Sequence, residues 1–92
     1  MYRIIDSRGS GKTSRLMLLA KETNSAIACA NPSAMQQKAY AYGIVGIEFI
    51  SYAQLFSGKY SGNIMIDEIE NYIKYQLPLN SEFMGYTLSN ED

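Results

Sequence analysis

Two short stretches of the sequence carry side chains that could act on a phosphate group. The first is Gly9-Ser10-Gly11-Lys12-Thr13, between an apolar run at residues 2–5 and a helix-type run that begins at Lys12. A glycine-rich turn between a strand and a helix presents backbone N–H groups and the positive end of the helix to an anion. In this pattern we expect Lys12 to reach the β- and γ-phosphates of a nucleotide, and Thr13 to bind Mg²⁺.

The second stretch is the acidic pair Asp67-Glu68, which follows the apolar run Ile64-Met65-Ile66. This arrangement is called Walker B. A carboxylate at the end of a buried parallel strand lies beside the phosphate loop, so Asp67 would hold the magnesium and Glu68 would orient and deprotonate an attacking water. An Asp-Glu pair alone is ordinary chemistry for a helix start. The order of the two stretches, with two β-α units between them, favours nucleotide binding.

The loop departs from the full pattern at one position. The pattern has a glycine where this chain has Asp6. That glycine serves the tight exit from the strand, and Ser7 and Gly9 offer another way to turn. An acidic group near phosphates is unfavourable unless Asp6 points away or pairs with Arg8. The sequence therefore predicts the location of a phosphate site but leaves its affinity open.

The elements that must position these residues alternate between β-type and helix-type runs, which predicts an α/β domain on a parallel sheet. Asn31-Pro32 and Ser51 are typical of helix starts. Signals are weak after Leu79, so we expect a nucleotide-binding domain over residues 1–79 and a tail over residues 80–92. The predicted strands are residues 2–5, 26–30, 45–50 and 63–66, and the predicted helices are residues 12–23, 32–42, 51–56 and 69–76.

Composition limits the remaining possibilities. A chain of 92 residues with 47% apolar content is one small domain. Eight basic against nine acidic residues give a net charge of -1, which supports no general attraction to nucleic acid or an anionic membrane. The single cysteine, Cys29, lies in an apolar run and indicates a buried, inert thiol in a reducing compartment. No apolar run reaches the ~18–20 residues of a spanning helix, and no signal peptide is recognisable, so a cytoplasmic protein is expected.

Over residues 1–76 the sequence resembles the P-loop ATPases that carry a catalytic glutamate, most closely the first half of a helicase or phage terminase motor core. SRGSGKTS, residues 7–14, resembles their Walker A loop, and IMIDEIE, residues 64–70, resembles their DE-type Walker B box. ACANPS, residues 28–33, resembles the segment that touches the DNA backbone in helicases. FISYAQL, residues 49–55, resembles a later strand that runs into a T-Y-x-x-L turn.

The resemblance implies a small three-layer RecA-like α/β domain with a mostly parallel sheet of about four strands, and ATP with Mg²⁺ as cofactors. Nothing after Ile69 resembles a sensor strand or an arginine finger. The chain therefore looks like a truncated, phage-encoded motor half. The implied roles are catalysis by Lys12 and Glu68, metal binding by Thr13 and Asp67, and nucleotide binding by Ser7, Arg8, Gly9, Ser10, Gly11, Lys12, Thr13 and Ser14.

Three functions remain open on the sequence. The first is a minimal ATPase with slow hydrolysis that acts in a homo-oligomer or on a larger protein partner. The second is a non-catalytic protein of a mobile element, for example an inhibitor of host defence, that binds another protein; eight tyrosines favour it slightly because tyrosine is enriched at interfaces. The third is a single-stranded nucleic-acid binder, ranked lowest because Lys38, Lys59 and Lys74 do not form a stripe.

Overall fold

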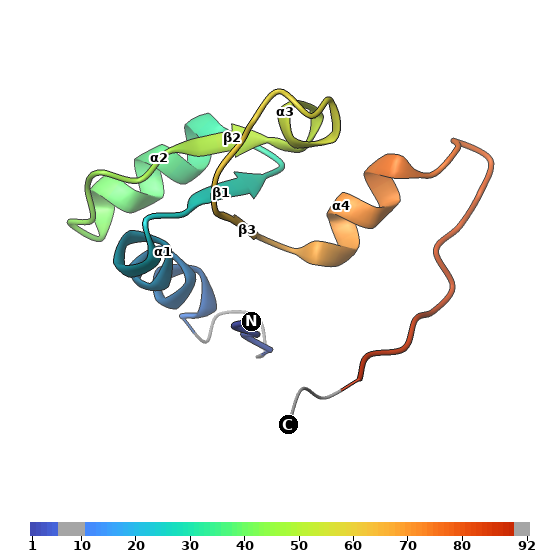
Figure 1. Ribbon diagram of the computed structural model, residues 1–92, viewed down its shortest axis with the longest axis horizontal. Helices are drawn as coiled ribbons and strands as arrows, with labels where there is room; N and C mark the ends of the chain where they lie inside the picture. Colours follow the sequence, from blue (N-terminus) through green and yellow to red (C-terminus); the bar gives the residue numbers. More distant parts are fainter. Residues whose placement is uncertain (6–10, 90–92) are drawn as a thin grey trace.

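The computed structural model describes residues 1–5 and 11–89, and within them the chain forms one parallel sheet of three strands (Figure 1). The strands are β1 (Ala26–Cys29), β2 (Phe49–Ser51) and β3 (Ile64–Ile66), in the order β2-β1-β3. Ile27 of β1 lies opposite Phe49 on one side and Met65 on the other. Because all three strands run the same way, their carboxyl ends meet at one edge. The predicted α/β class with a parallel sheet is confirmed.

The described part of the chain also forms four helices: α1 (Lys12–Thr23), α2 (Pro32–Ala41), α3 (Tyr52–Phe56) and α4 (Ile69–Gln76). The starts of α2 and α3 agree closely with the prediction because side-chain caps determine them. The Asn31 side chain accepts a hydrogen bond from the Ala34 N–H at the start of α2. Ser51 and Gln54 form a reciprocal capping box at the start of α3.

The core lies on both faces of β1, whose side chains alternate between them. Ile27 and Cys29 face α1 and α2, whereas Ala28 faces α3. All four β1 residues are buried, which explains their uninterrupted apolar sequence. The buried members of the first cluster are Met17, Ala20, Ile27, Cys29, Met35, Ala39, Ile44 and Ile47, and those of the second are Ala28, Ile50 and Tyr52.

Two predicted strands differ from the structure. The strand expected at residues 45–50 begins only at Phe49, because Gly46 has a φ of 87° and turns the chain just before it. The strand expected at residues 2–5 does not form, so the sheet has three strands in the described residues and not about four. A strand requires backbone pairing with a neighbour, and apolar residue types alone do not supply it.

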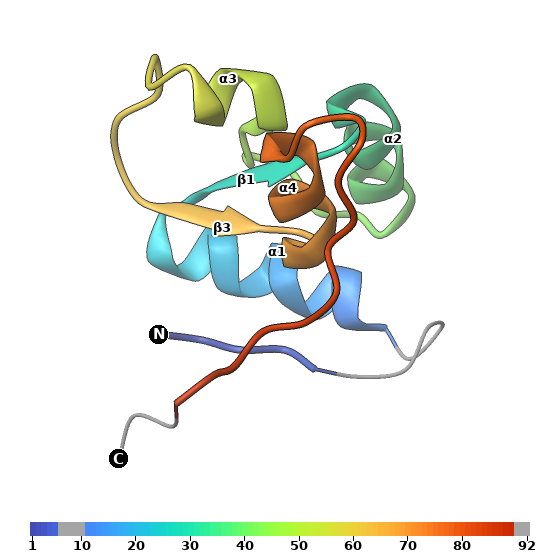
Figure 2. The same ribbon diagram turned by 90° about the vertical axis from the view of Figure 1, so that its right-hand side faces the viewer.

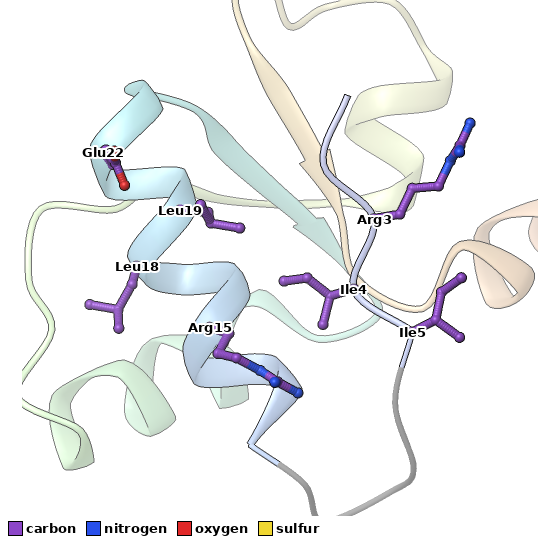
Figure 3. Close-up of a pocket in the computed structure, with 7 residues that line it drawn as sticks. All are labelled: Arg3, Ile4, Ile5, Arg15, Leu18, Leu19 and Glu22. Carbon is purple, nitrogen blue, oxygen red and sulfur yellow. The ribbon is translucent and has the colours of Figure 1, made fainter. Parts of the chain in front are cut away.

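The segment at residues 2–5 lies beside α1. The Ile4 side chain points toward the helix, while Arg3 and Ile5 point away from it (Figure 3). Together with α1 they border an open pocket of about 430 Å³. The Arg3 guanidinium donates a hydrogen bond to the Ser89 carbonyl at 3.1 Å, which ties the two ends of the described chain together.

Beyond α4 the described chain contains no further helix or strand. Figure 2 shows residues 77–89 as an extended stretch that passes α4 and approaches the N-terminal segment. The Tyr86 hydroxyl donates a hydrogen bond to the Glu70 carboxylate at 3.1 Å, an exposed contact. Within residues 1–5 and 11–89, none of the helices has the length and apolar character needed to cross a membrane.

The two faces of α1 provide a test of this core. Met17 is fully buried, whereas its neighbour Leu18 is 57% exposed. We expect Met17→Ala to lower the free energy of unfolding by about 2–5 kcal/mol, because it leaves a cavity between α1 and the sheet. Leu18→Ala removes a similar apolar volume from the surface and should cost less than about 1 kcal/mol. Urea unfolding followed by circular dichroism measures both, and equal losses would contradict this packing.

Candidate functional site

The carboxyl edge of the sheet brings the two predicted stretches together. Figure 2 shows the arrowheads of β1 and β3 and the first turn of α1 on the same side of the molecule. The Lys12 Nζ lies 3.0 Å from Glu68 Oε1, so the predicted phosphate lysine and the predicted general base form an ion pair. In open parallel sheets, ligands bind at this edge. The pocket of Figure 3 lies elsewhere, because neither Lys12 nor Glu68 lines it.

The ion pair contributes little to folding. The side chains of Lys12 and Glu68 are 27% and 46% exposed, so solvent screens their attraction. Pairs of this kind are worth at most about 1 kcal/mol. An anion with several charges can therefore compete with Glu68 for the Lys12 ammonium.

Gly11 begins the described part of the predicted phosphate loop. It is the N-cap of α1 and has a φ of 84°, a left-handed conformation that glycine adopts without steric cost. The Ser14 hydroxyl donates a hydrogen bond to the Gly11 carbonyl at 2.9 Å and closes the first turn. Thr13 is half-buried beside Lys12. The other predicted members of the loop, Ser7, Arg8, Gly9 and Ser10, lie outside the described residues, as does Asp6.

Asp67 is half-buried directly after β3. Its N–H donates a hydrogen bond to the Ala28 carbonyl at 2.9 Å, which extends the pairing of β3 with β1. Burial, and next the charge of Glu68, raise the pKa of the Asp67 carboxyl, while Lys38 and Lys12 act in the opposite direction. A carboxylate in this setting gains from a nearby cation.

The turn after Asp67 has an unusual backbone. Glu68 adopts φ 55° and ψ 69°, in the left-handed region. A residue other than glycine there costs roughly 1–2 kcal/mol. In this strained conformation the Glu68 carboxylate pairs with Lys12. The turn that carries the predicted base is therefore held in a backbone conformation that is unfavourable by itself.

The predicted metal ligands, Thr13 and Asp67, do not form a cluster in the described residues. Thr13 and Asp67 make no hydrogen bond with each other within residues 11–89. The described residues contain no group of three or more His, Cys, Asp or Glu side chains suited to a metal. Mg²⁺ is usually held by one or two carboxylates together with phosphate oxygens and water, so Asp67 and Thr13 fit a metal that arrives with a nucleotide.

Two residues at this edge were not among the predicted site residues. Lys38 of α2 lies near enough to lower the pKa of Asp67. The Tyr52 hydroxyl donates a hydrogen bond to the Asp67 carbonyl at 2.6 Å and contacts the Glu68 carbonyl at 3.4 Å. One feature of the sequence could have indicated Tyr52. It is a polar aromatic residue soon after a predicted strand, at the edge where the carboxyl ends of parallel strands meet.

Comparison of the chain with protein-family models, with curated proteins and with solved structures finds no match.

The raised pKa of Asp67 gives a pH-dependent stability. A native-state pKa above the ordinary 3.8 means that the folded protein holds this proton more tightly than the unfolded chain. The contribution of Asp67 to stability then declines as the pH rises from 3.8 through the raised value, and its penalty is complete above that value. We expect Asp67→Asn to remove this decline and to stabilise the protein at neutral pH.

Urea unfolding at several pH values measures the effect. Glu82→Gln, which removes an exposed carboxylate, is the matched control and should leave the pH dependence nearly unchanged. An Asp67→Asn variant whose stability follows that of the native chain at every pH would contradict this electrostatic account.

Proposed function

We propose that the protein binds a nucleoside triphosphate, with ATP and Mg²⁺ as the expected pair, between the first turn of α1 and the β3–α4 turn. The observation that supports this most directly is the 3.0 Å ion pair between Lys12 and Glu68. Lys12 begins α1 and Glu68 precedes α4, so the two residues are far apart in the sequence. Phosphoryl transfer uses a lysine and a carboxylate at one site. Glu68 also has a left-handed backbone, and such strain is frequent at functional sites.

Each residue has a role that follows from its chemistry. Lys12 would bind the β- and γ-phosphates, helped by the N–H groups at the start of α1 and by Ser7 to Ser14 of the loop. Thr13 and Asp67 would hold Mg²⁺, which neutralises phosphate charge when bound. Glu68 would accept the proton of the attacking water.

The ion pair bears on how a nucleotide would enter the site. The Glu68 carboxylate holds the Lys12 ammonium. A triphosphate that captures the ammonium releases the Glu68 carboxylate, which is then available as a base. Because the pair is partly exposed, breaking it costs little.

Hydrolysis by the isolated chain is expected to be slow. An arginine finger supplied by a neighbour is worth ~10³–10⁵ in rate for related reactions. We therefore expect efficient turnover only within a homo-oligomer or with a larger protein partner. The RecA-like arrangement and the phage origin are parts of this proposal that rest on the sequence resemblance. Residues 2–5, which were expected to form its first strand, do not join the sheet.

A second candidate is a protein-binding module without catalysis. Phe56 of α3 and Tyr75 of α4 are 60% and 49% exposed and contact each other with ring centroids 6.0 Å apart. Exposed aromatic residues of this kind are typical of interface anchors. Nucleotide binding without measurable hydrolysis would favour this function.

Calorimetric titration of ATP with Mg²⁺ tests the proposal. Lys12→Ala should weaken binding by about 10- to 100-fold, the usual effect of losing a hydrogen bond to a charged group. Lys21→Ala removes an exposed lysine from the last turn of the same helix and should leave binding unchanged. Equal affinities in the native protein and in Lys12→Ala would contradict the proposed site.

Glu68→Gln separates binding from hydrolysis. The amide cannot hold Lys12 as an ion pair, so ATP affinity should stay the same or rise. Loss of the general base should lower phosphate release by ~10²–10⁴-fold. If the native protein binds no ATP but Asp6→Gly does, the native chain has no nucleotide function, and its function lies on its surface.

A further inference from the structure

Tyr52 occupies a fixed position at the carboxyl edge of the sheet. It is the first residue of α3, and its side chain is 6% exposed. The capping box of Ser51 and Gln54 fixes the backbone on which it stands. Its ring packs against Tyr72 and Tyr75 of α4, with centroids 5.4 and 6.3 Å away. The ring therefore has little freedom to move.

The Tyr52 hydroxyl acts on the peptide unit between Asp67 and Glu68. It donates a hydrogen bond to the Asp67 carbonyl at 2.6 Å, and the Glu68 carbonyl lies 3.4 Å away. The Asp67 carbonyl belongs to the rigid, planar peptide unit that turns when the φ of Glu68 changes. Holding this carbonyl therefore restrains the left-handed φ of 55°.

Other hydrogen bonds hold the neighbouring peptide units. The Asp67 N–H donates to the Ala28 carbonyl at 2.9 Å and restrains the unit before Asp67. The Asn71 and Tyr72 N–H groups donate hydrogen bonds to the Glu68 carbonyl at 2.9 and 3.3 Å, as α4 begins. These bonds restrain the peptide unit after Glu68. Among the described residues, the Tyr52 hydroxyl is the side-chain donor to the unit before it.

We propose that Tyr52 is a positioning residue, whose hydroxyl holds the Asp67–Glu68 peptide so that the Glu68 carboxylate stays directed toward Lys12. The catalytic consequence rests on the proposed function, whereas the conformational consequence does not. Without the hydroxyl, the peptide unit can rotate and Glu68 can return to a negative φ. Its carboxylate then leaves Lys12 and the place where the attacking water would lie.

The hydroxyl remains a donor at all ordinary pH values. Burial, followed by the charges of Asp67, Cys29 and Glu68, raises the pKa of Tyr52 to about 12. The phenol of Tyr52 is therefore neutral and can donate a hydrogen bond to a carbonyl.

Tyr52→Phe is the test, because it keeps the ring contacts and removes only the oxygen. Tyr72→Phe is the matched control: it makes the same chemical change in the neighbouring ring, and the Tyr72 hydroxyl makes no hydrogen bond within the described chain. In Tyr52→Phe we expect kcat for ATP hydrolysis to fall by ~10- to 100-fold, the scale of a small misplacement of a reacting group. KM should change little because Lys12 stays available to the phosphates.

A second comparison excludes a merely structural role. In a Glu68→Gln background, Tyr52→Phe should have little further effect on turnover, because the group that it positions is already gone. Independent, multiplying losses would overturn the proposal. So would equal losses of kcat in Tyr52→Phe and Tyr72→Phe.

Nuclear magnetic resonance of the nucleotide-free protein tests the conformational part by itself. The ¹³C chemical shifts and the HN–Hα coupling of Glu68 report its φ. We expect a left-handed signature in the native protein and in Tyr72→Phe, and its loss in Tyr52→Phe. If Glu68 keeps this signature in Tyr52→Phe, the proposal is wrong, whether or not ATP binds. If the signature is lost and the native protein has no affinity for ATP, the positioning is correct and the proposed function is wrong.

Discussion

The arrangement of the whole molecule depends on the burial and pairing of β1. This strand pairs with β2 on one side and β3 on the other, and every residue from Ala26 to Cys29 is buried. A strand in this position has no face or edge left for solvent, which is typical of parallel sheets whose strands are joined by helices. The three carboxyl ends then meet at one edge, and residues that follow the strands become neighbours there.

The residues gathered at this edge contribute little to the stability of the fold. The Lys12–Glu68 pair is partly exposed, Glu68 has a strained backbone, and burial raises the pKa of Asp67. Each of these three features contributes little to the stability of the fold or lowers it. Their concentration at one edge is typical of sites where strain and perturbed charge serve a ligand. The core clusters around β1 supply the stability that allows them.

The sequence predicted the features that local chemistry determines. Asn31, Ser51 and the apolar run of β1 identified the helix starts and the central strand, and the Asp67-Glu68 turn was expected where it occurs. The strand predicted at residues 2–5 was wrong, because a strand must pair with the edge of a sheet that is formed by distant parts of the chain. The types of the residues themselves do not encode that pairing. The Tyr52 hydrogen bond could not be foreseen for the same reason, since it joins the ends of β2 and β3, which only the folded sheet brings together.

The aromatic residues link the two candidate functions physically. Phe56 contacts Tyr75, Tyr75 contacts Tyr52, and the Tyr52 hydroxyl holds the Asp67 carbonyl. Contact alone does not transmit an effect, because coupling needs an element with two arrangements that both sites can bias. Under the positioning proposed for Tyr52, the turn at Glu68 is such an element, since its left-handed backbone would compete with an unstrained negative φ. The exposed ring pair is therefore connected, through Tyr52, to the turn that directs Glu68 to Lys12.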